Sequence, residues 1–287
     1  MSESVSAEPR IFAAVVLYQC RAQDSVTCQA LIKAQIPTLL VDNSTEPNDN
    51  AAYAASVGML YHSMGGNAGL PKAYNCAVRL LATQADVLCL FDCDTTLSAD
   101  YWDVLRAALS AHPAQNLFVP WVMDAKGLLS PCRIRGCRVT RIADPLAVKA
   151  KELTAINSGT AIRMQAFQSL SYDEAMFLDY VDHAFFREAR RQGAFLTVLD
   201  TVLQQDFSGN ETTDLAAMRR RFSIFQRDFA YFCKEHWYTR LYAWFYIRKR
   251  RAYISYCAWR TRRAEKSALA QSKPKAAQTT QKPQNGN

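Results

Sequence analysis

Two aspartates separated by a single residue follow an apolar run near the middle of the chain. Asp92 and Asp94 end the stretch VLCLFDCD. Carboxylate oxygens are the ligands that hard divalent cations prefer, and a bound cation offsets the negative charge of a departing diphosphate. A turn leading into the next helix would use the same residue types, because aspartate is common in such turns. For this pair alone, both interpretations stay open.

A second pair of aspartates lies in the segment FLDYVDHAFFREARRQG. Asp179 and Asp182 are three residues apart and are expected to share one face where a helix starts. A carboxylate there accepts free backbone N–H groups, stays ionised near neutral pH and can take a hydroxyl proton as a general base. Simple N-capping explains the spacing equally well. The adjacent His183 is expected to be solvated or to cap the helix.

The elements that would position these acids alternate between two patterns over the first two hundred residues. Short apolar runs predict buried strands at 11–17, 37–42, 58–63, 86–92 and 116–123. Helical spacing occupies 24–35 and 71–83, and Ser98 is a good N-cap for a helix through His112. Further helical spacing follows Val181 and ends at Gly193. This alternation predicts an α/β domain with a mainly parallel sheet.

Ligands of such sheets bind beyond the carboxyl ends of the strands. These ends carry Tyr18, Asp42, the loop MGGNAGL and the pair Asp92 and Asp94. The loop matches neither the G-x-G-x-x-G dinucleotide fingerprint nor the lysine-containing phosphate loop, which excludes those two binding modes. Polar loops and acids at one edge suit a nucleotide whose diphosphate is held by a divalent metal.

The positive charge belongs to one part of the chain. The net charge is +8, yet residues 219–263 contain 13 Lys or Arg against 2 acids and 14 of the 32 aromatic residues, so the remainder is at −3. Basic clusters interrupt every apolar run there, which argues against a membrane-spanning helix. Interleaved aromatic and basic residues favour a segment at an anionic membrane surface. They also suit single-stranded nucleic acid.

Nine scattered cysteines lie in apolar surroundings, and the first residues lack a secretory pattern. Free thiols in a reducing cytoplasm are therefore expected. The spacings of Cys89 with Cys93 and of Cys132 with Cys137 would allow zinc, but no histidine stands at finger-like spacing.

Six ordered segments together resemble the family-two glycosyltransferases of the GT-A fold, and most closely their bacterial rhamnosyltransferase branch. The segments are VVLYQC, LLVDNS, GGNAGLPKAYNCAV, VLCLFDCDTTLSADYW, INSGTAIR and FLDYVDHAFFREARRQG. RRRFSIFQRD, from Arg219, is similar to the Arg-rich segment that follows the core in that branch. The similarity spans about residues 10 to 230. With the composition, it predicts a GT-A domain over 10–210, a basic aromatic helical segment over 211–263, and disordered ends at 1–9 and 264–287.

The resemblance implies an inverting hexosyltransferase. It would move L-rhamnose from dTDP-rhamnose to a hydroxyl of a glycan or polyprenyl-linked acceptor in bacterial surface polysaccharide synthesis. The enzyme would be cytoplasmic and peripheral on the inner face of the membrane. Asp182 would be the catalytic base, with Asp179 as the second choice. Donor-binding residues would be Tyr18, Asp42, Asn67, Gly69, Lys72 and Asp92; Ser158 and Gly159 would border the acceptor; Asp94, Asp92 and, as a further candidate, Gln205 would hold Mg²⁺ or Mn²⁺.

Two positions depart from the family pattern. Gln205 stands where the family often has a histidine, and Ala184 stands where an acid usually follows the base. Alternatives are the same mechanism with UDP-galactofuranose or UDP-glucose, or a non-catalytic protein that binds membranes or nucleic acid through a degenerate domain. A specific nucleic acid is not expected, and the oligomeric state stays open.

Overall fold

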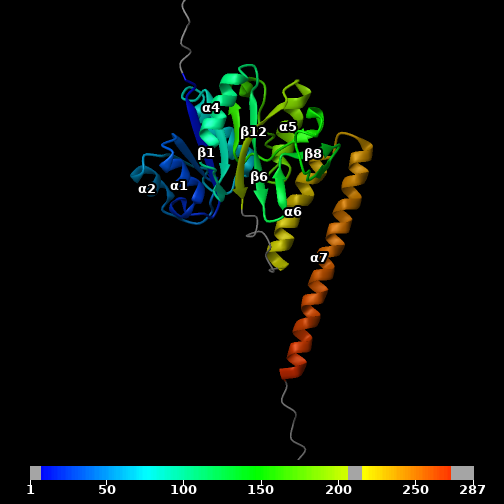
Figure 1. The fold of residues 1–287 in the computed structure, drawn as a ribbon. Helices are drawn as coiled ribbons and strands as arrows, with labels where there is room; N and C mark the ends of the chain where they lie inside the picture. The colour runs from blue at the N-terminus through cyan, green and yellow to red at the C-terminus, as the bar shows by residue number, and fades with distance from the viewer. Residues whose placement is uncertain (1–7, 206–214, 273–287) are drawn as a thin grey trace, which may run out of the picture.

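A computed structural model describes residues 8–205 and 215–272 (Figure 1). In this part of the chain, nine strands form one central sheet in the order β3-β2-β1-β4-β11-β6-β12-β5, with β7 paired to β6. Three short strands, β10, β8 and β9, form a second sheet beside it. The strands are β1 (Ile11–Leu17), β2 (Thr38–Asp42), β3 (Leu60–Ser63), β4 (Val87–Asp92), β5 (Thr95–Thr96), β6 (Leu117–Asp124), β7 (Gly127–Ser130), β8 (Cys132–Arg135), β9 (Arg138–Thr140), β10 (Leu153–Thr154), β11 (Thr160–Arg163) and β12 (Leu196–Gln205).

The pairing of the central sheet is mixed. β1 runs parallel to β2 and β4, β2 runs parallel to β3, and β6 runs parallel to β12. β11 is antiparallel to both of its neighbours, β4 and β6. The parallel pairs are joined through helices, as parallel connections require. The α/β class with a largely parallel central sheet is therefore confirmed.

Helices cover both faces of this sheet. They are α1 (Val26–Lys33), α2 (Asn50–Ser56), α3 (Leu70–Leu81), α4 (Tyr101–Ala111), α5 (Val181–Arg191), α6 (Leu215–Phe232) and α7 (Trp237–Ser272), with short 3-10 turns η1 (Ala22–Asp24), η2 (Ala150–Glu152) and η3 (Met164–Gln168). Successive residues of β1 alternate between two core clusters: Val16 lies with residues of α3, α5 and α6, and Val15 with residues of α1, α2 and α4. A strand buried on both faces reads as a continuous apolar run, which is why β1 was recognisable.

The local predictions hold unevenly. All five expected strands are present with ends shifted by a residue or two, whereas α2 and the strands of the 124–140 region were not expected. The N-cap expected at Ser98 is wrong. The α4 helix begins at Tyr101, and the Ser98 hydroxyl instead pairs with Thr201 Oγ1 at 2.6 Å. A contact to a strand a hundred residues away outcompetes the local cap.

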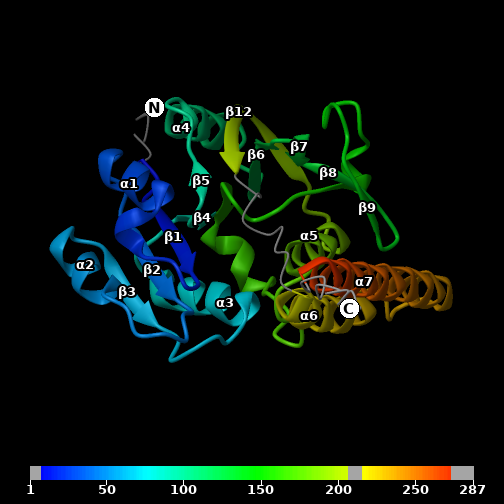
Figure 2. The same cartoon turned by 90° about the horizontal axis from the view of Figure 1, so that it is seen from below.

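The C-terminal part forms two antiparallel helices. Figures 1 and 2 show α6 and α7 side by side next to α5, with α7 continuing past α6. The aromatic face of α6 lies in the same core cluster as α3 and α5. The α7 helix extends to Ser272, past residue 264, where the tail was expected to begin. The disorder expected at residues 1–7 and 273–287 lies outside the described residues.

None of the helices within 8–205 and 215–272 has the length and apolar character needed to cross a membrane. All nine cysteines are free thiols, as their scattered positions indicated.

Candidate active site

The aspartate pair lies where β4 ends at the carboxyl edge of the sheet. After Asp92 the chain turns through Asp94 into β5, which pairs antiparallel with the last residues of β12. This pairing sets Gln205 opposite Thr95. The Gln205 amide nitrogen donates to Asp92 Oδ2 at 2.8 Å and to Asp94 Oδ1 at 3.3 Å. Three expected metal ligands are thus brought together, although the third is more than a hundred residues from the other two.

The donor set of this cluster fits a hard cation. Gln205 Oε1 is buried and has no hydrogen-bond partner in the part of the chain that the structure describes. Since the two ends of an amide are interchangeable in shape, rotating it would turn Oε1 toward Asp92 and Asp94. Two carboxylates and an amide oxygen are ligands suited to Mg²⁺ or Mn²⁺. Within residues 8–205 and 215–272, no group of three or more His, Cys, Asp or Glu is placed to hold a metal.

The pKa of Asp92 is also consistent with a cation site. Burial, and then the charge of Asp94, raise the pKa of Asp92 to about 6, while the hydrogen bond from Gln205 opposes the shift. Two carboxylates that share one site disfavour each other's ionisation unless a cation compensates for them. Asp94 itself is exposed at the mouth of a cavity of about 570 Å³, whose lining also includes Cys20, Asp124 and Gln205.

Ser158, in the turn with Gly159, hydrogen-bonds to Asp92 and to the neighbouring Thr95. Ser158 is buried; its hydroxyl accepts the Asp92 backbone N–H at 3.3 Å and pairs with the Thr95 hydroxyl. Gly159 has a φ of +78°, and a Cβ there would lie 2.8 Å from Pro120 Cγ. The structure therefore places both residues behind Asp92, and their expected role beside the acceptor stays a prediction.

Asp182 lies in the first turn of α5 and is held by one residue. Asn157 donates its side-chain N–H to Asp182 Oδ1 at 2.7 Å and its backbone N–H to Oδ2 at 3.3 Å. The Tyr172 hydroxyl in turn donates to Asn157 Oδ1 at 3.0 Å. Burial, and then the charge of Asp92, raise the pKa of Asp182 to about 7. Asp92 is therefore near enough to Asp182 to raise its pKa, and a carboxyl group with a pKa near 7 is suited to act as a general base at neutral pH.

Asp179 and His183 are placed differently from expectation. Asp179 precedes α5 and forms an ion pair with Arg221 of α6, with Nη2 at 2.7 Å from Oδ1. The prediction that Asp179 and Asp182 share a helix face is wrong, because the chain enters α5 through Tyr180 in a left-handed conformation with φ 62°. His183 is only partly exposed and does not cap the helix: its Nδ1 lies 3.0 Å from Thr154 Oγ1, and burial lowers its pKa to about 4.

Asp42 lies at the end of β2 and is almost completely buried. Its carboxylate accepts hydrogen bonds from Asn50 Nδ2 at 2.9 Å, the Ser44 backbone N–H at 2.9 Å and the Tyr61 hydroxyl at 3.2 Å. Burial alone would raise the pKa of Asp42, but the hydrogen bonds from Ser44 and Asn50 outweigh it and hold the pKa below its usual value. Tyr18, at the end of the adjacent β1, is half exposed.

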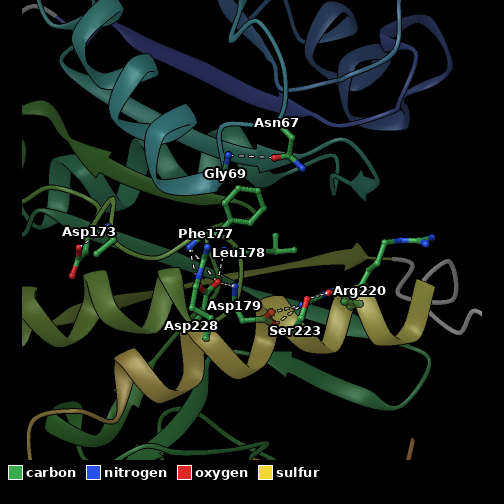
Figure 3. Close-up of polar contacts among 12 residues, drawn as sticks. Asn67, Gly69, Asp173, Phe177, Leu178, Asp179, Arg220, Ser223 and Asp228 are labelled. Atoms are coloured by element: carbon green, nitrogen blue, oxygen red, sulfur yellow. Dashed lines mark hydrogen bonds and ion pairs between the residues drawn. The ribbon is translucent and has the colours of Figure 1, made fainter. Parts of the chain in front are cut away.

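The glycine-rich loop is built on two asparagines. Asn43 Nδ2 donates to Asn67 Oδ1 at 3.2 Å. Figure 3 shows the Gly69 N–H donating to the same oxygen, at 3.2 Å. Gly69 has a φ of +91°, and its Cα faces the ring of Phe177, which a Cβ would approach to 2.8 Å. Lys72 is exposed in the first turn of α3. Asn43 follows β2, and Asn67 and Gly69 lie between β3 and α3, so these residues follow the carboxyl ends of neighbouring strands.

Sequence reasoning missed Asn157 and Tyr172. Asn157 falls within a quoted segment of the resemblance, directly before Ser158, but an isolated asparagine has no distinguishing pattern. Only the contacts of Asn157 with Asp182 show what it does.

Comparisons with known proteins bear on the fold. No family model matches the sequence, and no curated protein matches it. Among solved structures, the chain is similar to the mannosyltransferase PcManGT from Pyrobaculum calidifontis, in complex with GDP-Man and Mn²⁺, with 13% identity over 93% of this chain and 76% of that chain and a TM-score of 0.56. It is also similar to S. aureus TarS, with 12% identity over 77% of this chain and a TM-score of 0.50.

The chain spans 44% of the length of that TarS chain, and 65% of the shorter TarS 1-349 structure, with which it shares 14% identity over 76% of its own length and a TM-score of 0.49. At these identities the likeness concerns the fold, and it confirms the GT-A fold expected from the sequence.

Proposed function

We propose that this protein is a metal-assisted, inverting glycosyltransferase that moves a sugar from a nucleoside diphosphate to a hydroxyl group. The observation that carries the proposal is the cluster of Asp92, Asp94 and Gln205 at one sheet edge, together with Asp182, whose pKa is raised to about 7 by burial and by the charge of Asp92. A GT-A fold supports it, as does the GDP-Man and Mn²⁺ complex of PcManGT.

The residues of this chain divide the reaction between two sides of the site. Asp182, oriented by Asn157, accepts the proton of the acceptor hydroxyl as its oxygen bonds to the anomeric carbon. The bond from that carbon to the diphosphate breaks on the opposite face, which inverts the configuration. Asp92, Asp94 and Gln205 would hold Mg²⁺ or Mn²⁺, which supplies charge stabilisation for the leaving diphosphate.

The donor side would be formed by the strand ends before the motif. Asp42 and Tyr18 would contact the nucleoside, and Asn67, Gly69 and Lys72 would lie along the ribose or diphosphate. We assign dTDP-rhamnose as the first donor to test and bacterial surface polysaccharide as the product class, on the sequence resemblance. UDP-galactofuranose and UDP-glucose are the next donors in order.

Peripheral attachment to the inner face of the cytoplasmic membrane completes the proposal, and α7 supports it. Trp237, Leu241, Trp244 and Arg248 recur every three or four residues and are all exposed, so they share one outward face. The Arg248 guanidinium lies 4.5 Å from the Trp244 ring centroid. Aromatic rings beside stacked arginines suit an anionic headgroup layer.

The position of α7 also agrees with a lipid-linked acceptor. β12 ends at the carboxyl edge of the sheet, and α6 leads away from that edge. The α7 helix then runs back antiparallel to α6 and projects beyond the domain (Figure 1). A membrane contacted by α7 would therefore lie on the side of the sheet that carries Asp92 and Asp94.

A donor panel tests the catalytic proposal. Thermal shifts and donor hydrolysis are measured with dTDP-rhamnose, UDP-galactofuranose, UDP-glucose and GDP-mannose, each with Mg²⁺, Mn²⁺ or EDTA. We expect one donor to stabilise the protein and turn over only with metal, and Asp94→Ala to remove turnover with the fold intact. Asp103→Ala is the matched control, because the Asp103 side chain on α4 is 89% exposed.

Stabilisation by no nucleotide sugar would overturn the enzyme proposal and favour the non-catalytic membrane or nucleic-acid binder. Unchanged turnover in Asp94→Ala would remove the metal assignment and leave sugar transfer standing.

A further inference from the structure

One carboxylate of α6 is buried in an unusual setting. Asp228 is completely inaccessible to solvent, and it accepts hydrogen bonds from three consecutive backbone N–H groups (Figure 3). The N–H groups of Leu178, Asp179 and Phe177 lie 2.7, 3.0 and 3.1 Å from Asp228 Oδ2. Successive N–H groups that converge in this way form an anion-binding concavity, here filled by a side chain of the same protein. Asp228 thus fixes the backbone of residues 177–179.

The fixed segment reaches the donor side of the site in one direction. The Phe177 carbonyl oxygen accepts the Leu70 N–H, the first of α3, at 2.8 Å. The Phe177 ring lies against Gly69 on one side, and the Arg227 guanidinium lies 5.3 Å from its centroid. The glycine-rich loop therefore abuts a residue whose own backbone is held by Asp228.

In the other direction the segment leads directly into the helix of the proposed base. Tyr180 packs on α6, with its ring centroid 4.8 Å from Phe229 and 5.0 Å from Phe232, and its left-handed backbone turns the chain into α5. Asp182 follows two residues later. Arg221 adds a second tie between α6 and this segment through its ion pair with Asp179.

We propose that Asp228 is a positioning residue for sugar transfer, which sets the donor loop and the first turn of α5 relative to each other through residues 177–180. This inference rests on the proposed function. Asp228 touches neither the donor loop nor Asp182. It acts through the three N–H groups that it accepts, and a misplacement of about 1 Å at a reacting group can cost a hundredfold in rate.

Graded variants test the inference. Asp228→Asn keeps one oxygen acceptor, and Asp228→Ala removes both. The matched control is Thr239→Val, since Thr239 is a buried anchor of the same helix pair, with its hydroxyl 2.7 Å from the Cys233 carbonyl oxygen, and has no contact with residues 177–180. Metal-dependent transfer is measured with the donor found in the panel, and kcat is expressed per folded molecule at a temperature where every variant is folded.

We expect kcat to fall about tenfold in Asp228→Asn and about a hundredfold in Asp228→Ala, with a raised KM for the donor and no change in the control. A kcat per folded molecule that stays within about twofold of wild type in Asp228→Asn would reduce Asp228 to a purely structural role. If Asp228→Ala does not fold, the Asp228→Asn result decides.

Hydrogen exchange provides a readout that does not need activity. In Asp228→Asn, we expect faster exchange at 177–179, at the Leu70 amide and in the first turn of α5, with wild-type exchange in β1 and β2. Faster exchange at 177–179 alone would overturn the proposed coupling. If the coupling is present and no nucleotide sugar is turned over by the wild type, the proposed function fails while the structural link stands.

Discussion

The two C-terminal helices have similar composition and opposite environments. In α6 the four phenylalanines recur at spacings of three and four residues and are buried against α5 and the loop before it: Phe222, Phe225, Phe229 and Phe232. In α7 the large aromatic residues are mostly exposed, among them Trp244, Phe245 and Trp259. Spacing on the helix, and not the number of aromatics, decides which helix joins the core.

The face of α7 that does pack explains the difference. Ala243, Ile254 and Ala258 are its buried apolar residues, and small side chains let it lie close along α6. Tyr242 and Tyr246 lie against Phe229 of α6, whereas the tryptophans and Phe245 are exposed, as are Arg248 and Lys249. One helix therefore packs into the core, and the other leaves most of its aromatic residues exposed, although both belong to a single basic aromatic stretch of sequence.

The largest expected effect is on stability, which should fall much more when an aromatic residue of α6 is replaced than when one of α7 is replaced. Phe229→Ala removes a ring from the core and should lower the free energy of unfolding by about 3–5 kcal/mol, because a cavity remains. Phe245→Ala, on an exposed α7 position, should change it by less than about 0.5 kcal/mol. Urea denaturation followed by circular dichroism measures both. Equal losses would mean that α7 is as much a part of the core as α6.

Membrane binding should be weakened by substitutions in α7 and not by a substitution in α6. Replacing Trp244, Phe245 and Trp259 together by Gln should lower partitioning to liposomes rich in phosphatidylglycerol by at least about tenfold, since each ring loses its apolar contact with the interface. The conservative control is Phe222→Leu on α6, which should bind liposomes as wild type does. Sedimentation with 100 nm vesicles checks the result, and an unaffected triple variant would remove α7 as the attachment site.

A change of pH should act on the site and spare α7. The pKa of Asp182 is raised to about 7 by burial and by Asp92, so this proposed base is mostly protonated below that pH. Between pH 6 and pH 8, kcat/KM should rise about tenfold, with an inflection near 7. Liposome binding should not change, because Lys and Arg stay charged. A profile that is flat across this range would exclude Asp182 as the base.

The same pKa has a consequence for folding. Because the pKa of Asp182 is higher in the folded state, the folded protein keeps a proton that the unfolded chain has lost, and stability falls as pH rises from about 4 to about 7. Asp182→Asn carries no charge and should show a weaker fall in Tm over that range.

The smallest effects should come from single arginines. Arg221→Ala on α6 loses the ion pair with Asp179 and should lower stability by about 1 kcal/mol or less with liposome binding unchanged. Arg248→Ala on α7 should weaken liposome binding by about fivefold, the value of one basic residue near an anionic surface, with stability unchanged. Stability and liposome binding are measured for both variants. Weaker liposome binding by Arg221→Ala, or lower stability of Arg248→Ala, would contradict the contrast between the helices.

Much of the site was predictable because the ends of buried strands can be recognised in the sequence. The apolar runs that end at Asp42 and Asp92 are buried on both faces, so their polar residues had to emerge at one edge. Asp179 was misjudged since the left-handed Tyr180 has no sequence signature, and His183 since its partner Thr154 is distant along the chain.

The sequence by itself determined the α/β class, the strand-end acids Asp42, Asp92 and Asp94, and the basic aromatic character of the C-terminal part. Short-range periodicity and residue chemistry suffice for these. Tertiary structure decided that Gln205 joins the acids through the β5–β12 pairing, that Asn157 orients Asp182, and that Asp228 holds residues 177–179. These contacts join residues 25 to 113 positions apart, and no local pattern encodes such distances.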